Sequence, residues 1–192
     1  MSDVSPVFEA TAEALRRATF RPDLAVREIP SPSGVAPHSI AFAGDVRPDS
    51  HGDSSYGTGR FLLLHDPEEP ESWGGPWRIV AFAQAPLELD IGTDPMLAEV
   101  TWSWLTDALA AHHAHYHSAA GTATKTVSRG FGSLAAQGDG SQVELRASWT
   151  PEPPSARHIE AWAELVCMLA GLPPGSEGIA ILRPGPHRFR ST

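Results

Sequence analysis

The stretch GRFLLLHDPEEPESWGGPWRIVAFA (59–83) carries two short apolar runs on either side of a polar loop. The runs at 61–64 and 79–83 have the length of β-strands, and their unbroken apolar character is typical of central strands with both faces covered. Between them, the segment 66–76 is rich in proline, glycine and acidic residues, which favour turns. The stretch therefore predicts two neighbouring strands joined by a long hairpin loop.

Four more strand-length segments lie outward from this pair. Residues 24–29 have a mixed pattern that indicates an edge strand, and residues 39–43 are short and apolar. Residues 142–149 alternate, which predicts a half-buried strand with the apolar phase Val143, Leu145, Ala147 and Trp149. The predicted partner of this strand, residues 122–129, alternates more weakly, and a glycine-rich connection joins the two.

Three helices are predicted from apolar residues at helical spacing. The first follows the Ser-Pro pair at 5–6, because serine caps free amides and proline at the first helical position loses no bond. The second begins near the Asp-Pro pair at 94–95 and is expected to end before Gly121. The third follows Ser155 and ends at Gly171, where a left-handed glycine and two prolines stop the helix.

The resulting element order is α-β-β-β-β-α-β-β-α. Runs of strands separated by single helices favour an antiparallel sheet with helices packed on it. We therefore expect an α+β fold, with a mainly antiparallel sheet of about six strands and three helices, in a single domain at 5–178. A flexible basic C-terminal tail is expected at 179–192.

Charge and composition limit the partners. The 192-residue chain has a net charge of −9, and its only basic cluster is Arg183, Arg188 and Arg190 in the tail. Nucleic-acid binding needs clustered cations that neutralise phosphates, so nucleic acid is not expected as a partner. No apolar run reaches membrane-spanning length, the N-terminus lacks signal-peptide features, and a single cysteine, Cys167, cannot form an internal disulfide. We expect no membrane partner and a cytoplasmic location.

Motifs that carry chemistry are scarce. The sequence contains no phosphate-binding loop and no nucleophile elbow. His113 and His117 would lie four residues apart on the polar face of the second helix, a spacing that can bind a transition metal, but no carboxylate or cysteine accompanies them. A solvated, histidine-rich helix end is the simpler interpretation. The sequence predicts no catalytic residue, metal site or cofactor, and it favours a protein that is not an enzyme.

Three tryptophans are candidate binding residues. Trp102 points away from the apolar face of the second helix, and Trp73 and Trp77 bracket two glycines in an otherwise polar loop. Exposed tryptophan is enriched at binding hot spots because it buries a large area with few rotamers to fix. The alternative is that another part of the chain covers these side chains.

Two arginines form a second candidate site. Arg129 and Arg146, with Glu144, lie on the polar phase of the predicted hairpin of the last two strands. There they would line a ligand pocket between the sheet and the second helix. The alternative is cross-strand ion pairing on a solvated sheet face.

Several stretches resemble the actinobacterial family catalogued as domain of unknown function 3000. They are GRFLLLHDP (59–67), WGGPWRIVAFAQAPLE (73–88), DPMLAEVTWSWLTDAL (94–109), ELRASWTP (144–151) and HIEAWAELVCMLAGLPP (158–174). The resemblance spans about Phe8 to Gly178 and implies a cytosolic protein of a GC-rich bacterium. It implies no activity, substrate or catalytic residue. The element order also resembles that of small secretion chaperones, an analogy of fold that carries no function.

Three classes of function follow from these observations. The leading hypothesis is a non-catalytic, adaptor-like or chaperone-like domain that binds another protein, motivated by the acidic chain and Trp102. The alternative is a small-ligand-binding protein or an enzyme with a pocket between the sheet and the second helix. Nucleic-acid binding through the tail is disfavoured by the overall charge. A homodimer remains open.

Overall fold

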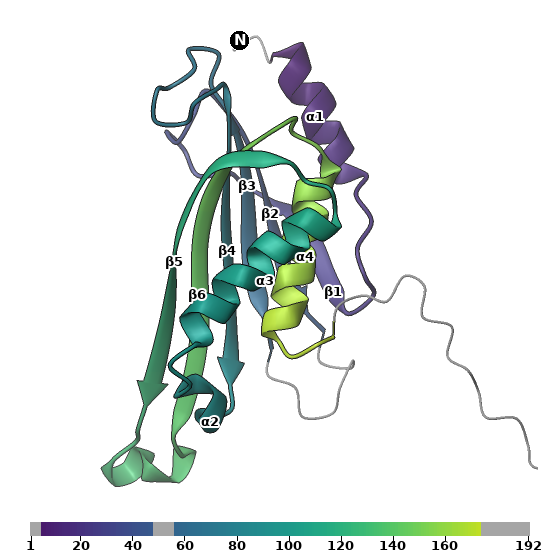
Figure 1. Ribbon diagram of the computed structural model, residues 1–192. Coiled ribbons are helices and arrows are strands. Elements are labelled where there is room, and N and C mark those ends of the chain that lie inside the picture. The colour runs from purple at the N-terminus through teal and green to yellow at the C-terminus, as the bar shows by residue number, and fades with distance from the viewer. Residues whose placement is uncertain (1–4, 48–55, 174–192) are drawn as a thin grey trace, which may run out of the picture.

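The computed structural model describes residues 5–47 and 56–173 (Figure 1). The helices are α1 (Pro6–Arg16), α2 (Leu89–Gly92), α3 (Leu97–Ala111), the 3-10 helix η2 (Gly132–Gln137) and α4 (Ala156–Leu169). The strands are β1 (Leu24–Ile29), β2 (His38–Val46), β3 (Thr58–His65), β4 (Trp77–Leu87), β5 (Tyr116–Ser128) and β6 (Gly140–Pro151). The predicted tail at 179–192 lies outside the described residues.

The six strands form one antiparallel sheet in the order β1-β2-β3-β4-β6-β5. This confirms the predicted α+β fold with a six-stranded antiparallel sheet. β1 lies at one edge, as expected, and β5 lies at the other. Because β6 is inserted between β4 and β5, the chain crosses from β4 to the far edge through α2 and α3 and then returns as β6.

The helices α1, α3 and α4 pack on one face of the sheet (Figure 1). α4 approaches the strands closely, with Trp162 over Gly44 and Gly59. A Cβ atom at Gly59 would come within 2.9 Å of the Trp162 ring, so this position has no room for a side chain. The Trp162 indole N–H donates to the Phe82 carbonyl at 3.0 Å, which ties α4 to β4. We call this side of the sheet the covered face.

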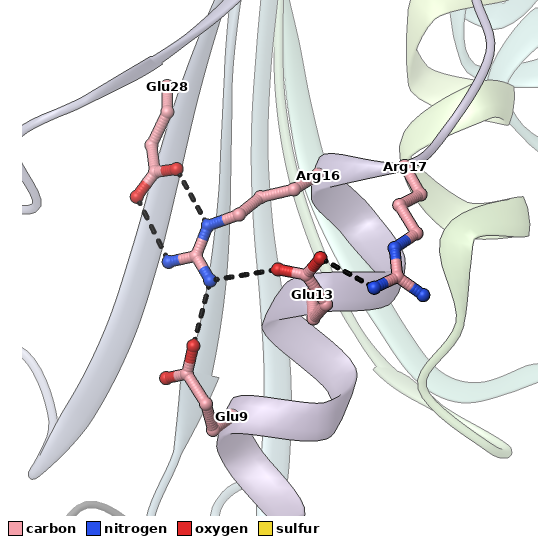
Figure 2. A network of polar contacts seen from close by, with 5 residues as sticks. All are labelled: Glu9, Glu13, Arg16, Arg17 and Glu28. Atoms are coloured by element: carbon pink, nitrogen blue, oxygen red, sulfur yellow. Dashed lines mark hydrogen bonds and ion pairs between the residues drawn. The ribbon is translucent and has the colours of Figure 1, made fainter.

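α1 is held by burial and oriented by charge. Phe8, Ala12 and Leu15 are buried against the core. Arg16 donates to both carboxylate oxygens of Glu28 on β1 and also contacts acidic side chains of α1 itself (Figure 2). Exposed ion pairs contribute only about 0–1 kcal/mol each, so the buried stripe holds the helix and the ion pairs orient it.

The second predicted helix is shorter than expected. α3 ends at Ala111, His113 adopts a left-handed conformation with φ 53°, and β5 begins at Tyr116. His113 and His117 therefore do not share a helix face. The prediction that they lie one helical turn apart, as a metal site on a helix would need, is wrong. The turn closes because Ala114 is buried and its N–H donates to the Leu109 carbonyl. A histidine takes the place in which glycine is usual, so the sequence did not mark the turn.

The number of helices also differs from the prediction. The four-residue α2 lies between β4 and α3, and the connection between β5 and β6 forms the short helix η2. The last helix agrees with the prediction: α4 follows Ser155, Gly171 has φ 80°, and Leu172 packs back with 4% exposure. None of the described helices is long and apolar enough to cross a membrane.

Candidate functional site

The second face of the sheet carries no helix among residues 5–47 and 56–173 (Figure 1). In β4, Ile79 and Ala81 are buried on the covered face, whereas Val80 points to the other side and is 37% exposed. We call this second side the open face. The prediction that both faces are covered is wrong for the run at 79–83, because Val80 is exposed on this side. In the run at 61–64, Leu64 is buried on this side and Leu62 is half-buried.

The strand register aligns the side chains of the open face in rows that cross the strands. One row consists, from β1 to β5, of Ile29, Ala41, Leu62, Val80, Ser148 and Ala120. All but the serine are apolar, and we call this set the apolar row. Neighbouring strands lie about 4.8 Å apart, so the row is about 24 Å long.

The neighbouring row carries positive charge. It consists of Arg27, Ala43, Arg60, Phe82, Arg146 and Thr122, and we call it the cationic row. The three guanidinium groups come from alternate strands and are separated by small or aromatic side chains. The Arg146 guanidinium carbon lies 5.8 Å from the centre of the Phe82 ring, a cation–π contact that keeps the charge beside an apolar surface.

A fourth arginine, Arg78, lies on the other side of the apolar row. It donates to the Ser148 hydroxyl at 2.7 Å, the Thr150 hydroxyl at 3.0 Å and the Ser118 carbonyl at 2.9 Å. Burial lowers the pKa of Arg78, but an arginine keeps its charge in proteins. Arg60 donates to the Thr58 hydroxyl and the Gly59 carbonyl. Among the described residues, neither guanidinium bonds to a carboxylate.

Two carboxylates on the strands neutralise part of this charge. Asp45 pairs with Arg27 at 2.6 Å, and Glu144 pairs with Arg146. Burial opposes ionisation of Asp45, but hydrogen bonds from Arg27 and Thr58 outweigh it and lower the pKa of this carboxyl. The described strands thus present four guanidinium groups and two carboxylates on the open face, in a chain whose net charge is −9.

A shallow depression of about 600 Å³ crosses β4, β6 and β5 on the open face. Its lining includes Val80, Phe82, Ala120, Thr122, Arg146 and Ser148. The apolar groups form its floor, and the guanidinium and the hydroxyls lie among them. This chemistry suits an apolar side chain that has a carboxylate close to it.

The structure places the three candidate tryptophans in different environments. Trp77 is the first residue of β4, is 8% exposed and lies 4.3 Å from the His65 ring, so its expected place in the loop is wrong. Trp102 is half-buried on the covered face, where a Cβ on Gly121 would meet its ring at 2.5 Å. Trp73 is half-buried in the loop at 66–76, and its carbonyl accepts from Thr150.

The two candidate arginines do not converge. Arg146 lies on the open face, and Arg129 follows the end of β5, where it pairs with Asp139 at 2.9 Å. The β5 partner of Arg146 is Thr122, seven residues from Arg129, which separates the two positions by about 24 Å. Arg146 faces away from α3, so the two arginines do not form the expected pocket between the sheet and the second helix.

The groove beside α3 lies elsewhere, between α3, α4 and residues 19–21, with a volume of about 680 Å³. Three carboxylates line it, from Asp107, Glu160 and Glu164, together with apolar groups such as Phe20 and Met168. Arg21 also lines the groove and contacts Glu164 at 3.4 Å. The groove is therefore acidic, the opposite of the open face.

The completely buried histidine has a structural role. His158 is completely buried, and its Nδ1 accepts the indole N–H of Trp149 at 3.1 Å. Burial lowers the pKa of His158 to about 4, so the ring is neutral at pH 7. No group of three or more histidine, cysteine or acidic side chains in the described part of the chain is placed to hold a metal ion.

The candidate residues predicted from the sequence do not include Leu62, Val80, Phe82, Arg60 or Arg78. The signal was present in the spacing, because each arginine lies in the same strand phase as the apolar residues two and four positions later. An arginine that begins an apolar run in this phase indicates that one face of the strand is solvated.

Comparison with known proteins yields one match. The model of the family described as "Protein of unknown function (DUF3000)" matches residues 4–180. No curated protein and no solved structure matches the chain.

Proposed function

We propose that this chain, which belongs to the DUF3000 family of proteins of unknown function, binds another protein through the open face of its sheet. The observation that supports the proposal is the apolar row, in which Val80 and Ala120 are exposed, Ile29 and Leu62 are half-buried and Ala41 is buried between its neighbours. No helix of the described residues covers this row. A β-sheet buries an apolar face against another layer, and a contiguous exposed apolar surface marks an interaction site.

The chemistry of the open face favours binding over catalysis. Its charged groups are mainly guanidiniums, which do not exchange protons near neutral pH. Arginines beside an aromatic ring and aliphatic side chains are typical of the centre of a protein interface. We therefore favour a role as an adaptor or a chaperone-like protein.

The test compares two valines with the same exposure. Val80 lies on the open face and Val100 on the outer side of α3, and both are 37% exposed. The tagged full-length chain and its Val80→Asp and Val100→Asp variants are expressed in the native host. Proteins that co-purify are quantified by mass spectrometry, and circular dichroism checks that each variant is folded.

We expect a stoichiometric partner that is retained by the unchanged chain and by Val100→Asp and is reduced at least tenfold by Val80→Asp. The same partners with all three chains, or no partner with any, would contradict the proposal. If the co-purifying species is a second copy of the chain, light scattering will report a dimer that Val80→Asp dissociates.

The acidic groove supports a second candidate, the binding of a small cationic ligand. Its volume of about 680 Å³ lies within the range of ligand sites, roughly 300–1,000 Å³. Thermal-shift assays with a panel of amines test this role. We expect stabilisation that Asp107→Asn reduces, whereas no shift with any amine would reject it.

A further inference from the structure

We infer that the partner presents an acidic amphipathic helix of about 16 residues, which lies across the strands on the apolar row. The inference rests on the proposed function and specifies what the open face recognises. It follows from the length of the row, the spacing of the arginines and the sign of the charge.

The length of the row sets the size of the segment. Six strands about 4.8 Å apart give about 24 Å between Ile29 and Ala120. A helix that rises 1.5 Å per residue spans this distance with about 16 residues. One apolar stripe at helical spacing would then contact Leu62 and Val80 at the centre of the row.

The spacing of the arginines favours a helix over an extended chain. Arg27, Arg60 and Arg146 lie on alternate strands, so they repeat every ~10 Å along the cationic row. Helical side chains seven residues apart repeat every ~10.5 Å on one side of the helix. Alternate side chains of an extended chain repeat every ~6.7 Å, a poorer match. A helix also satisfies its own backbone hydrogen bonds over an apolar surface.

The charge of the open face requires acidic residues on the helix. Arg60 and Arg78 lie on opposite sides of the apolar row, and neither bonds to a carboxylate of the described residues. Carboxylates on both sides of the apolar stripe would complete these charge-assisted hydrogen bonds.

The same charge disfavours two other occupants. The segment at 179–192 of this chain carries three arginines and no acidic residue, so it would be repelled. In a second copy, the same face has the same excess of guanidinium groups, so a symmetric pairing would bring like charges together. An acidic partner is the occupant that the charges favour.

Peptide selection tests which side chains the open face recognises. A phage-displayed library of 16-residue peptides has leucine fixed at helical spacing and all flanking positions randomised. It is selected on the full-length protein and counter-selected on the folded Val80→Asp variant. We expect the selected flanks to be enriched at least threefold in Asp and Glu and depleted in Lys and Arg.

The selected peptides are then measured by fluorescence anisotropy against charge-reversal variants. Arg146→Glu lies on the cationic row, and Arg17→Glu, at the residue that follows α1, makes the same change in net charge away from the open face. We expect Arg146→Glu to weaken binding about tenfold and Arg17→Glu to leave it unchanged, because a direct ion pair is lost only in the first.

Neutral or basic flanks in the selected peptides, an equal effect of both reversals, or a circular dichroism spectrum of the bound peptide without helix would overturn the inference. These outcomes are separate from failure of the proposed function. A cellular partner lost by Val80→Asp but recognised through a basic or extended segment would leave protein binding intact and remove only the acidic helix.

Discussion

The two faces of the same sheet differ in packing and in charge. On the covered face, Phe61 is fully buried, and Gly44 and Gly59 leave room only for the Trp162 ring. On the open face, Phe82 is half-buried beneath the guanidinium of Arg146. Close packing restricts the side chains of the covered face, whereas the open face presents charged groups around an apolar centre.

This difference separates stability from recognition. On a close-packed face, the removal of each methylene group lowers the free energy of unfolding, whereas a solvated face tolerates substitution. The chain can therefore change its open face at low cost to folding, which is a property expected of a binding surface. Substitutions on the two faces should therefore differ in their cost to stability.

The largest effect is expected from a matched pair of phenylalanines on neighbouring strands. Phe61→Ala on the covered face should lower the free energy of unfolding by about 3–5 kcal/mol, because it leaves a cavity in the core. Phe82→Ala on the open face should cost about 1 kcal/mol, since much of the ring is already solvated. Urea unfolding of both variants measures the difference. Equal costs would show that both faces are packed.

A second prediction uses pH to weaken the covered side. His158 has a pKa near 4 in the folded protein and an ordinary value of 6.5 when unfolded. The unfolded chain binds the proton more tightly, so this stability is complete above pH 6.5 and is lost as pH falls toward 4. The loss is roughly 3 kcal/mol.

Urea unfolding at pH 7.5, 5.5 and 4.5 checks this dependence, with His158→Gln as the control. Glutamine keeps an acceptor for the Trp149 indole N–H but does not ionise in this range. The variant should have a flatter pH profile than the unchanged chain. Identical profiles would show that other groups cause the acid sensitivity.

A third, smaller effect distinguishes two arginines of the open face. Arg78→Met removes hydrogen bonds to β5 and β6 and should cost about 1–2 kcal/mol. Arg146→Met removes one exposed ion pair and should change stability by less than about 0.5 kcal/mol. Thermal unfolding compares the two. A larger cost for Arg146→Met would assign it a structural role instead of a recognition role.

The smallest effect is expected at Arg129, beyond the end of β5. Its ion pair with Asp139 is exposed, so Arg129→Ala should leave the thermal unfolding midpoint unchanged. It should also leave partner binding unchanged, because Arg129 is remote from the apolar row. A loss of the partner in the pull-down with this variant would extend the binding surface to the hairpin tip.

The sequence predicted much of the fold but little of the candidate site. Apolar periodicity identified all six strands and α1, α3 and α4. The left-handed glycine predicted after the last helix is confirmed at Gly171. The end of α3 was missed, because His113 occupies a left-handed position that glycine usually takes. Of the five candidate residues, Arg146 lies on the open face and Trp77 is in the core.

The alternation and spacing of apolar residues by themselves determined which segments are strands and helices, because backbone periodicity is a local property. The tertiary structure alone decided that the helices gather on one face, and that residues from six strands form an apolar row beside a cationic row. Rows across a sheet depend on register and strand order, which bring together residues far apart in the chain. No local pattern in the sequence encodes that juxtaposition.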